Sequence, residues 1–173
     1  MTNFDKVISS LRYLQLHLDP RSDYNSRYLI QKITYLNQAL GMDTNYHFTV
    51  YVAGPYSPTL SVDYYSQMPR LRTLESGYQL SSLDKERLDR IKNCCGLLEN
   101  SSIMESTSTL VFLHRSGNTN DNELIREIRR LKPHLTYETI IIGLTRMKEL
   151  LFKSEYLTES LKREGDEWDS IDE

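Results

Sequence analysis

The sequence predicts a mainly α protein of about seven helices with one short two-stranded antiparallel ribbon. Two observations lead to this prediction. Apolar residues recur at steps of three and four through most of the chain, which is the period of a helix with one buried face. Between residues 48 and 53 the spacing changes to alternation, which is typical of a half-buried strand.

Three helices are expected in the first part of the chain. Their predicted ranges are Phe4 to about Leu18, about Tyr24 to Leu40, and about Pro58 to Met68. Pro20 and Pro69 are expected to stop the first and third of these helices, because proline disfavours helix in the residue before it. Gly41 follows the second helix in the position of a C-terminal glycine.

The strand ends in the turn Gly54-Pro55-Tyr56-Ser57-Pro58, where Ser57 is predicted to cap the third helix and Pro58 suits its first turn. Residues 78–80 form a second short β-type run, and we expect this run to pair with residues 48–52. The resulting ribbon would lean on the helices, in a winged-helix-like fold that is α+β at most.

The sequence of the second half of the chain predicts four more helices. The first begins at a capping box of Ser81 and Asp84, and the next covers roughly Glu105 to His114 and is buried on most sides. A third follows a cap at Asn120 or Asp121 and is broken by Lys132-Pro133. Thr136 is expected to cap the last helix, whose continuation as far as Lys162 is left open.

Length and composition favour one globular domain, residues 1–163, followed by an acidic segment, residues 164–173. The last ten residues hold six acids and no base, so the remainder has 21 bases against 18 acids, a charge of +3. The acidic segment is most simply a solvated end. Alternatively, it covers a basic face of this protein or engages a basic face of a partner.

No apolar run approaches the roughly 20 residues of a membrane-spanning helix, and the first residues lack the pattern of a signal peptide. The cysteines are the neighbours Cys94 and Cys95, with Cys95 expected to face inward, and no further residues stand at zinc-ligand spacing. We therefore expect a cytoplasmic protein that does not bind membranes.

The sequence predicts no catalytic residues, no metal and no cofactor. The four histidines are scattered, and no glycine-rich phosphate-binding loop is present. Ser57 lacks the Gly-x-Ser-x-Gly context of a nucleophile and is more simply a cap. An enzyme with a Tyr or Ser nucleophile at the turn is therefore the least favoured hypothesis.

Six of the twelve tyrosines crowd around the predicted ribbon, a pattern that suits either an interface or a small ribbon that needs amphipathic aromatics. Arg70, Arg72 and Lys85 lie nearby in the sequence and could contact phosphates, which gives the alternative hypothesis of a winged-helix-like nucleic-acid binder. A second basic stretch is expected to be solvated and paired with Glu123 and Glu127. It consists of Arg126, Arg129, Arg130 and Lys132.

Residues 30–36, Ile-Gln-Lys-Ile-Thr-Tyr-Leu, are followed by Phe48-x-Val50-Tyr51-x-x-Gly54-Pro55-Tyr56-Ser57-x-x-Leu60. This arrangement resembles the pattern "QKL-x-YL … F-x-x-Y-x-x-GPYS-x-x-L" of a prokaryotic family related to the YwgA-like proteins. More distantly, it resembles the Panacea domains of SocA-type antitoxins. The match is tightest over residues 28–68.

The resemblance implies a compact helical domain that acts by contact with a protein, such as a toxin or a protease system. The resulting hypothesis is a non-enzymatic interaction module of a toxin–antitoxin or defence system, with its oligomeric state open and a dimer included. The residues predicted for the contact surface surround the turn. They are Gln31, Lys32, Tyr35, Tyr51, Gly54, Pro55, Tyr56 and Ser57. A structural interpretation, in which Gln31 and Lys32 bond the turn and hold the second helix against the ribbon, explains the same residues.

Overall fold

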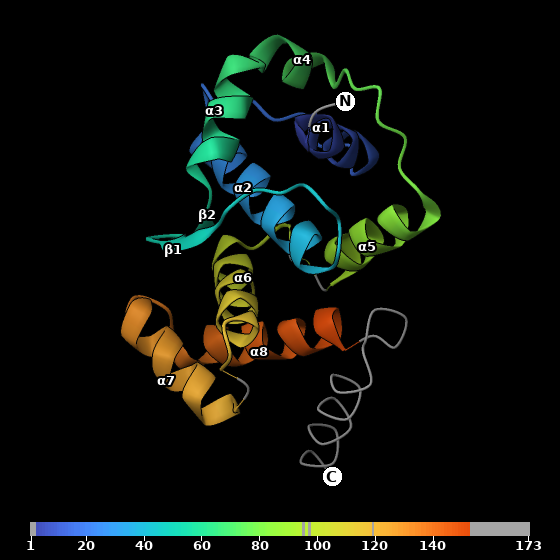
Figure 1. Cartoon of the computed structure of the whole chain (residues 1–173). Coiled ribbons are helices and arrows are strands. Elements are labelled where there is room, and N and C mark those ends of the chain that lie inside the picture. Colours follow the sequence, from blue (N-terminus) through green and yellow to red (C-terminus); the bar gives the residue numbers. More distant parts are fainter. Residues whose placement is uncertain (1–2, 95, 97, 119, 153–173) are drawn as a thin grey trace.

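The computed structural model describes residues 3–94, 96, 98–118 and 120–152. Within these residues the chain forms eight α-helices and one two-stranded antiparallel sheet, which confirms the mainly α prediction (Figure 1). In chain order the elements are α1 (Asn3–Tyr13), α2 (Tyr24–Ala39), β1 (Thr49–Tyr51), β2 (Gly54–Tyr56), α3 (Pro58–Ser66), α4 (Met68–Thr73), α5 (Ser82–Asn93), α6 (Ser101–Arg115), α7 (Asp121–Leu131) and α8 (Tyr137–Leu151).

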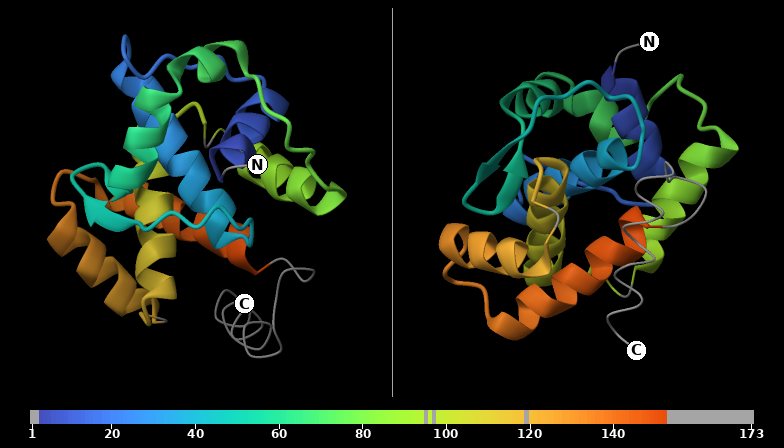
Figure 2. Two further views of the ribbon diagram at one scale, coloured as in Figure 1. Left: turned by 45° about the horizontal axis from the view of Figure 1, so that its top comes forward. Right: turned by 60° about the horizontal axis from the view of Figure 1, so that its bottom comes forward.

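Helices α2 and α6 occupy the middle of the molecule. Figure 1 and the right-hand view of Figure 2 show α1, α3 and α4 at one end and α7 and α8 at the other. One connected apolar core runs through both ends. Ile33 and Leu36 of α2, Leu110 of α6 and Ile140 of α8 are at most 1% exposed within it.

Helix α6 is buried nearly all round, as the apolar run in its sequence predicts. Even the polar residues Ser106 to Thr109 have no exposed surface. Thr107 and Ser108 satisfy their hydroxyls by donating to carbonyls three or four residues earlier in the same helix. The helix crosses α8 closely at Gly143, where an added Cβ would overlap the Ser106 hydroxyl. It begins at Ser101, capped by Asn100, four residues earlier than predicted.

Two further predicted helix boundaries are wrong. Helix α1 ends at Tyr13 rather than Leu18, because Gln15 takes a left-handed conformation (φ 57°) and Leu16 N–H donates back to Leu11 O. The third helix is not stopped by Pro69. Helix α3 ends at Ser66, and Pro69 instead lies in the first turn of the separate helix α4, where no N–H bond is lost.

The predicted partner of the first strand is also wrong. Thr49 pairs with Tyr56 and Tyr51 pairs with Gly54, so the chain turns back at once through Val52 and Ala53 into a hairpin. Gly54 makes the tight turn because it adopts a φ of +108°. Residues 78–80 form no strand and pass across α1, where Ser9 Oγ donates to the carbonyl of Tyr78.

The predicted caps are confirmed. Ser57 caps α3, Ser81 and Asp84 form the capping box of α5, and Asn120 and Thr136 cap α7 and α8. Gly41 follows α2 with a φ of +116°. The predictions for Cys95, for a helix as far as Lys162 and for residues 164–173 concern residues outside those described. Among the helices that are described, none has the length and apolar character needed to cross a membrane.

Candidate functional site

The eight residues predicted for the contact surface converge where α2, the hairpin and α3 meet, but most are inside the protein. Gln31 and Lys32 are 2% exposed, and Tyr35, Gly54, Pro55 and Ser57 are also buried. Tyr56 is half-buried, and only Tyr51 is largely exposed, at 54%. The buried members therefore lie where the structural interpretation places them.

Gln31 bonds the start of α3 through both ends of its amide. Its Oε1 accepts from Ser57 N–H at 2.8 Å, and its Nε2 donates to Ser57 O at 3.0 Å and to Ser61 Oγ at 3.1 Å. The two bonds to Ser57 satisfy both backbone groups of a residue with no exposed surface. Gln31 therefore ties α2 to the end of the hairpin.

Lys32 extends from α2 to the other side of the same turn. Its Nζ donates to Pro55 O at 2.7 Å and lies 5.0 Å from the ring centroid of Tyr28. The pKa of Lys32 is lowered to about 7, chiefly by burial and also by the nearby positive charge of Lys132, while Glu105 opposes the shift. The bond to the Pro55 carbonyl partly compensates the buried Lys32 amine for the water that it loses.

Lys132, just after α7, belongs to this cluster although the sequence predicts it elsewhere. It was expected on a solvated face, yet it is 2% exposed and donates to Tyr51 O and, at 2.5 Å, to Val52 O. The sequence does contain a signal for its inward position. Lys132 continues the four-residue steps of the buried Leu124 and Ile128.

Glu105 of α6 supplies the negative charge of this region. Its Oε1 lies 3.8 Å from Lys132 Nζ and 2.9 Å from His134 Nε2, and the residue is only 8% exposed. Burial lowers the pKa of Lys132, and the Glu105 carboxylate counteracts that effect. The carboxylate therefore helps to keep a buried lysine charged beneath the hairpin.

The tip of the hairpin is fixed from below by these contacts. The carbonyls of Tyr51, Val52 and Pro55 all accept from buried ammonium groups. Gly54 lies directly on α6, since an added Cβ would be 3.1 Å from Thr109 Oγ1. The residue at the tip, Val52, is nevertheless 85% exposed.

A chain of tyrosines connects this tip to α3. The rings of Tyr51 and Tyr56 are 5.1 Å apart, and Tyr56 Oη lies 2.6 Å from Ser61 Oγ. Next to Ser61 on α3, Val62 is 64% exposed, and Tyr65 one turn later is 42% exposed. We call the exposed set Tyr51, Val52, Val62 and Tyr65 the hairpin–α3 face, because the hairpin and α3 that carry these residues lie on the same side of the molecule (Figure 1).

The three residues predicted for nucleic-acid binding are not gathered into one surface. Arg70 pairs with the buried Asp5, and Arg72 Nη2 lies 3.2 Å from Asp19 Oδ2. Lys85 belongs to α5, and α1 lies between α4 and α5 (Figure 1). Two of the three cations are thus engaged with carboxylates of the protein itself.

Within the described residues, the site offers little for catalysis or metal binding. Ser57 has no exposed surface, and its Oγ accepts from Leu60 N–H at 3.4 Å as the cap of α3. In the same part of the chain, no group of three His, Cys, Asp or Glu residues could hold a metal ion.

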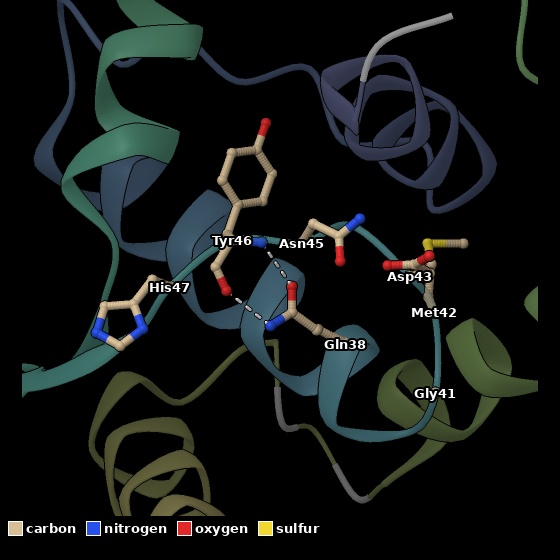
Figure 3. Close-up of a pocket in the computed structure, with 7 residues that line it drawn as sticks. All are labelled: Gln38, Gly41, Met42, Asp43, Asn45, Tyr46 and His47. Carbon is tan, nitrogen blue, oxygen red and sulfur yellow. Dashed lines mark hydrogen bonds between the residues drawn. The ribbon is translucent and has the colours of Figure 1, made fainter.

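A separate hollow lies where the end of α2 meets the loop that leads to β1 (Figure 3). It has a volume of about 500 Å³ and is open to solvent. Gln38 spans it, donating to Tyr46 O at 2.8 Å and accepting from Tyr46 N–H at 3.0 Å. Tyr46 Oη in turn donates to Asp63 Oδ2 of α3 at 2.6 Å, and this hydrogen bond holds the loop against α3.

Compared with protein-family models, with curated proteins and with solved structures, the chain matches none of them. The resemblance to the YwgA-like and Panacea families therefore stays a prediction from the sequence.

Proposed function

We propose that this protein is a non-enzymatic interaction module that binds a protein partner through the hairpin–α3 face. The observation that carries the proposal is the combination of an exposed apolar tip with a buried ionic support. Val52 is 85% exposed, yet the turn that presents it is bonded by Lys32 and Lys132 from beneath.

Such a support favours binding because a preorganised loop loses little conformational freedom when a partner docks. The exposed residues are also of the kind that interfaces use. Tyrosine offers a large contact area with a polar tip, and it is enriched among the residues that dominate binding energy. The hairpin–α3 face contains two exposed tyrosines, Tyr51 and Tyr65, and two exposed valines, Val52 and Val62.

The class of partner comes from the sequence resemblance. Panacea domains of SocA-type antitoxins act by contact with a toxin, so the proposed partner is a toxin or another protein of a prokaryotic defence system, bound in the cytoplasm. The positions of the eight predicted residues support two separate roles. Gln31 and Lys32 hold the turn, while Tyr51 and its neighbours meet the partner.

The test is affinity capture with the tagged chain from a lysate of its host, followed by titration of the purified partner. Val52→Asp places a charge at the exposed tip of the hairpin and should weaken binding at least about tenfold, as expected for a residue that contributes strongly to binding. Leu83→Asp is the matched control, because Leu83 is a 40% exposed aliphatic residue on α5, away from the face.

Circular dichroism establishes that both variants stay folded. A partner that binds the wild type and Leu83→Asp but not Val52→Asp supports the proposal. Equal binding to all three chains contradicts the assigned face. Recovery of nucleic acid in place of protein, with an affinity that falls steeply as salt is added, would favour the nucleic-acid alternative instead.

A further inference from the structure

The outer surface of α7 carries two arginines that face solvent. Leu124 and Ile128 turn the opposite side of the helix into the core, with no exposed surface. Arg126 and Arg129 are exposed, and neither belongs to an ion pair within the described residues. The guanidinium of Arg129 lies 6.0 Å from the ring centroid of Tyr137, which is itself 58% exposed.

These arginines border an open hollow of about 530 Å³, which Asn122 and the half-buried Ile125 also line. The acids of α7 are largely engaged elsewhere. Asp121 pairs with Lys148 at 3.1 Å, and Glu127 pairs with Arg130. Glu123 is the remaining acid on the helix. The hollow therefore combines positive charge with an apolar contact point.

The sequence of this chain contains a segment of complementary chemistry. Residues 164–173 hold six acids and no base, and among the acids stand Trp168 and Ile171. Carboxylates suit the two arginines, and an indole ring suits both an aliphatic side chain and a guanidinium group.

One ion pair connects α8 to the first residue of α7, because Lys148 Nζ is 3.1 Å from Asp121 Oδ2. The eleven residues 153–163 between Phe152 and the acidic segment span up to ~40 Å when extended. Helix α7 is only ~16 Å long. Tethering at this range gives the acidic segment an effective concentration on the order of millimolar at the α7 surface. Even a contact of weak affinity would therefore be substantially occupied.

We propose that residues 164–173 bind the α7 surface of their own chain, with Trp168 against Ile125 and the acidic side chains on Arg126 and Arg129. Bound in this way, the segment covers the basic face of α7. A partner that binds this face through an acidic segment of its own would first have to displace residues 164–173. The site is distinct from the hairpin–α3 face and does not depend on it.

Trp168 is the only tryptophan of the chain, so its fluorescence reports this contact without interference from other indoles. The measurement is quenching by acrylamide, a neutral quencher, in the full-length protein at low salt. Arg126→Glu/Arg129→Glu should increase the quenching constant at least about twofold, and about 0.5 M NaCl should do the same to the wild type, because the contact is ionic and exposed. The matched control is Arg21→Glu/Lys85→Glu, which changes net charge equally at two exposed residues elsewhere.

A second variant changes the segment rather than the folded body. Glu167→Gln/Asp169→Asn should release Trp168 as well, which keeps the test valid even if the arginine variant unfolds. The proposal is overturned if Trp168 in the wild type is quenched as readily as in a synthetic peptide of residues 153–173. It is equally overturned if protection survives both variants, or if protection depends on protein concentration, which would place the segment on a second copy.

Discussion

The pKa of Lys32 leads to a quantitative prediction for the pH dependence of stability. In the folded protein burial lowers this pKa to about 7, whereas an unfolded chain has the ordinary value of 10.5. Between these two values the unfolded state binds more protons than the folded state, so the free energy of unfolding rises with pH. The contribution is complete above the unfolded pKa and is lost progressively as pH falls to the folded pKa.

Lys32→Met keeps an unbranched apolar side chain of similar length, one atom shorter, but removes the titrating group. With the two pKa values above, linkage gives a gain of about 2.5 kcal/mol in the wild type between about pH 6 and about pH 9. The variant should lack that gain. It should also lose the bond to Pro55 O at every pH, which shifts its stability without changing the slope.

The assay is urea denaturation at constant ionic strength across this pH range, with the difference between wild type and variant taken at each pH. Subtraction removes the contribution of the histidines, which both chains share. Lys85→Met, a change at an exposed lysine of α5, should retain the slope of the wild type. A difference that changes by less than about 0.5 kcal/mol over the range would contradict this prediction, because Lys32 would then titrate near its ordinary pKa in the folded protein.

Two further predictions concern glycines at close contacts. Gly54→Ala should lower the free energy of unfolding by about 1–3 kcal/mol, because φ is +108° and the new Cβ would lie 3.1 Å from Lys32 Cε. Gly77→Ala is the control in the same denaturation assay, because Gly77 has open space around it. Gly143→Ala should lower it by about 1–3 kcal/mol through overlap with Ser106, and Ser106→Gly in the same chain should restore part of the loss. An unchanged midpoint of thermal unfolding for Gly143→Ala would show that α6 and α8 can separate freely.

The features that the sequence predicted correctly are local ones. The caps at Ser57, Ser81 and Thr136 each depend on residues within one turn, and the helical stripes depend on spacing within a single element. The predicted partner of the first strand was wrong. Either residues 78–80 or the residues just after a tight turn could pair with it, and the local sequence pattern does not favour one over the other.

The site shows the same limit. Gln31 and Lys32 were identified with the turn they bond, because they belong to a recognisable sequence pattern. Lys132 was not, since its partners Tyr51 and Val52 are eighty residues away and a lysine is ordinarily solvated. The buried position of Lys132 depends on the tertiary packing of α7, which periodicity indicates only faintly through Leu124 and Ile128.

The support beneath the hairpin also has a consequence for biosynthesis. Lys32 is made before the turn, but Lys132 is made eighty residues after Val52. At a synthesis rate of about 5–20 residues per second, that interval is roughly 4–16 s. Until it has passed, the nascent chain has the hairpin sequence without the second ammonium group that holds the carbonyls of its tip. Chains released before residue 132 therefore lack a fixed tip, which restricts a rigid hairpin to chains that have been translated through α7.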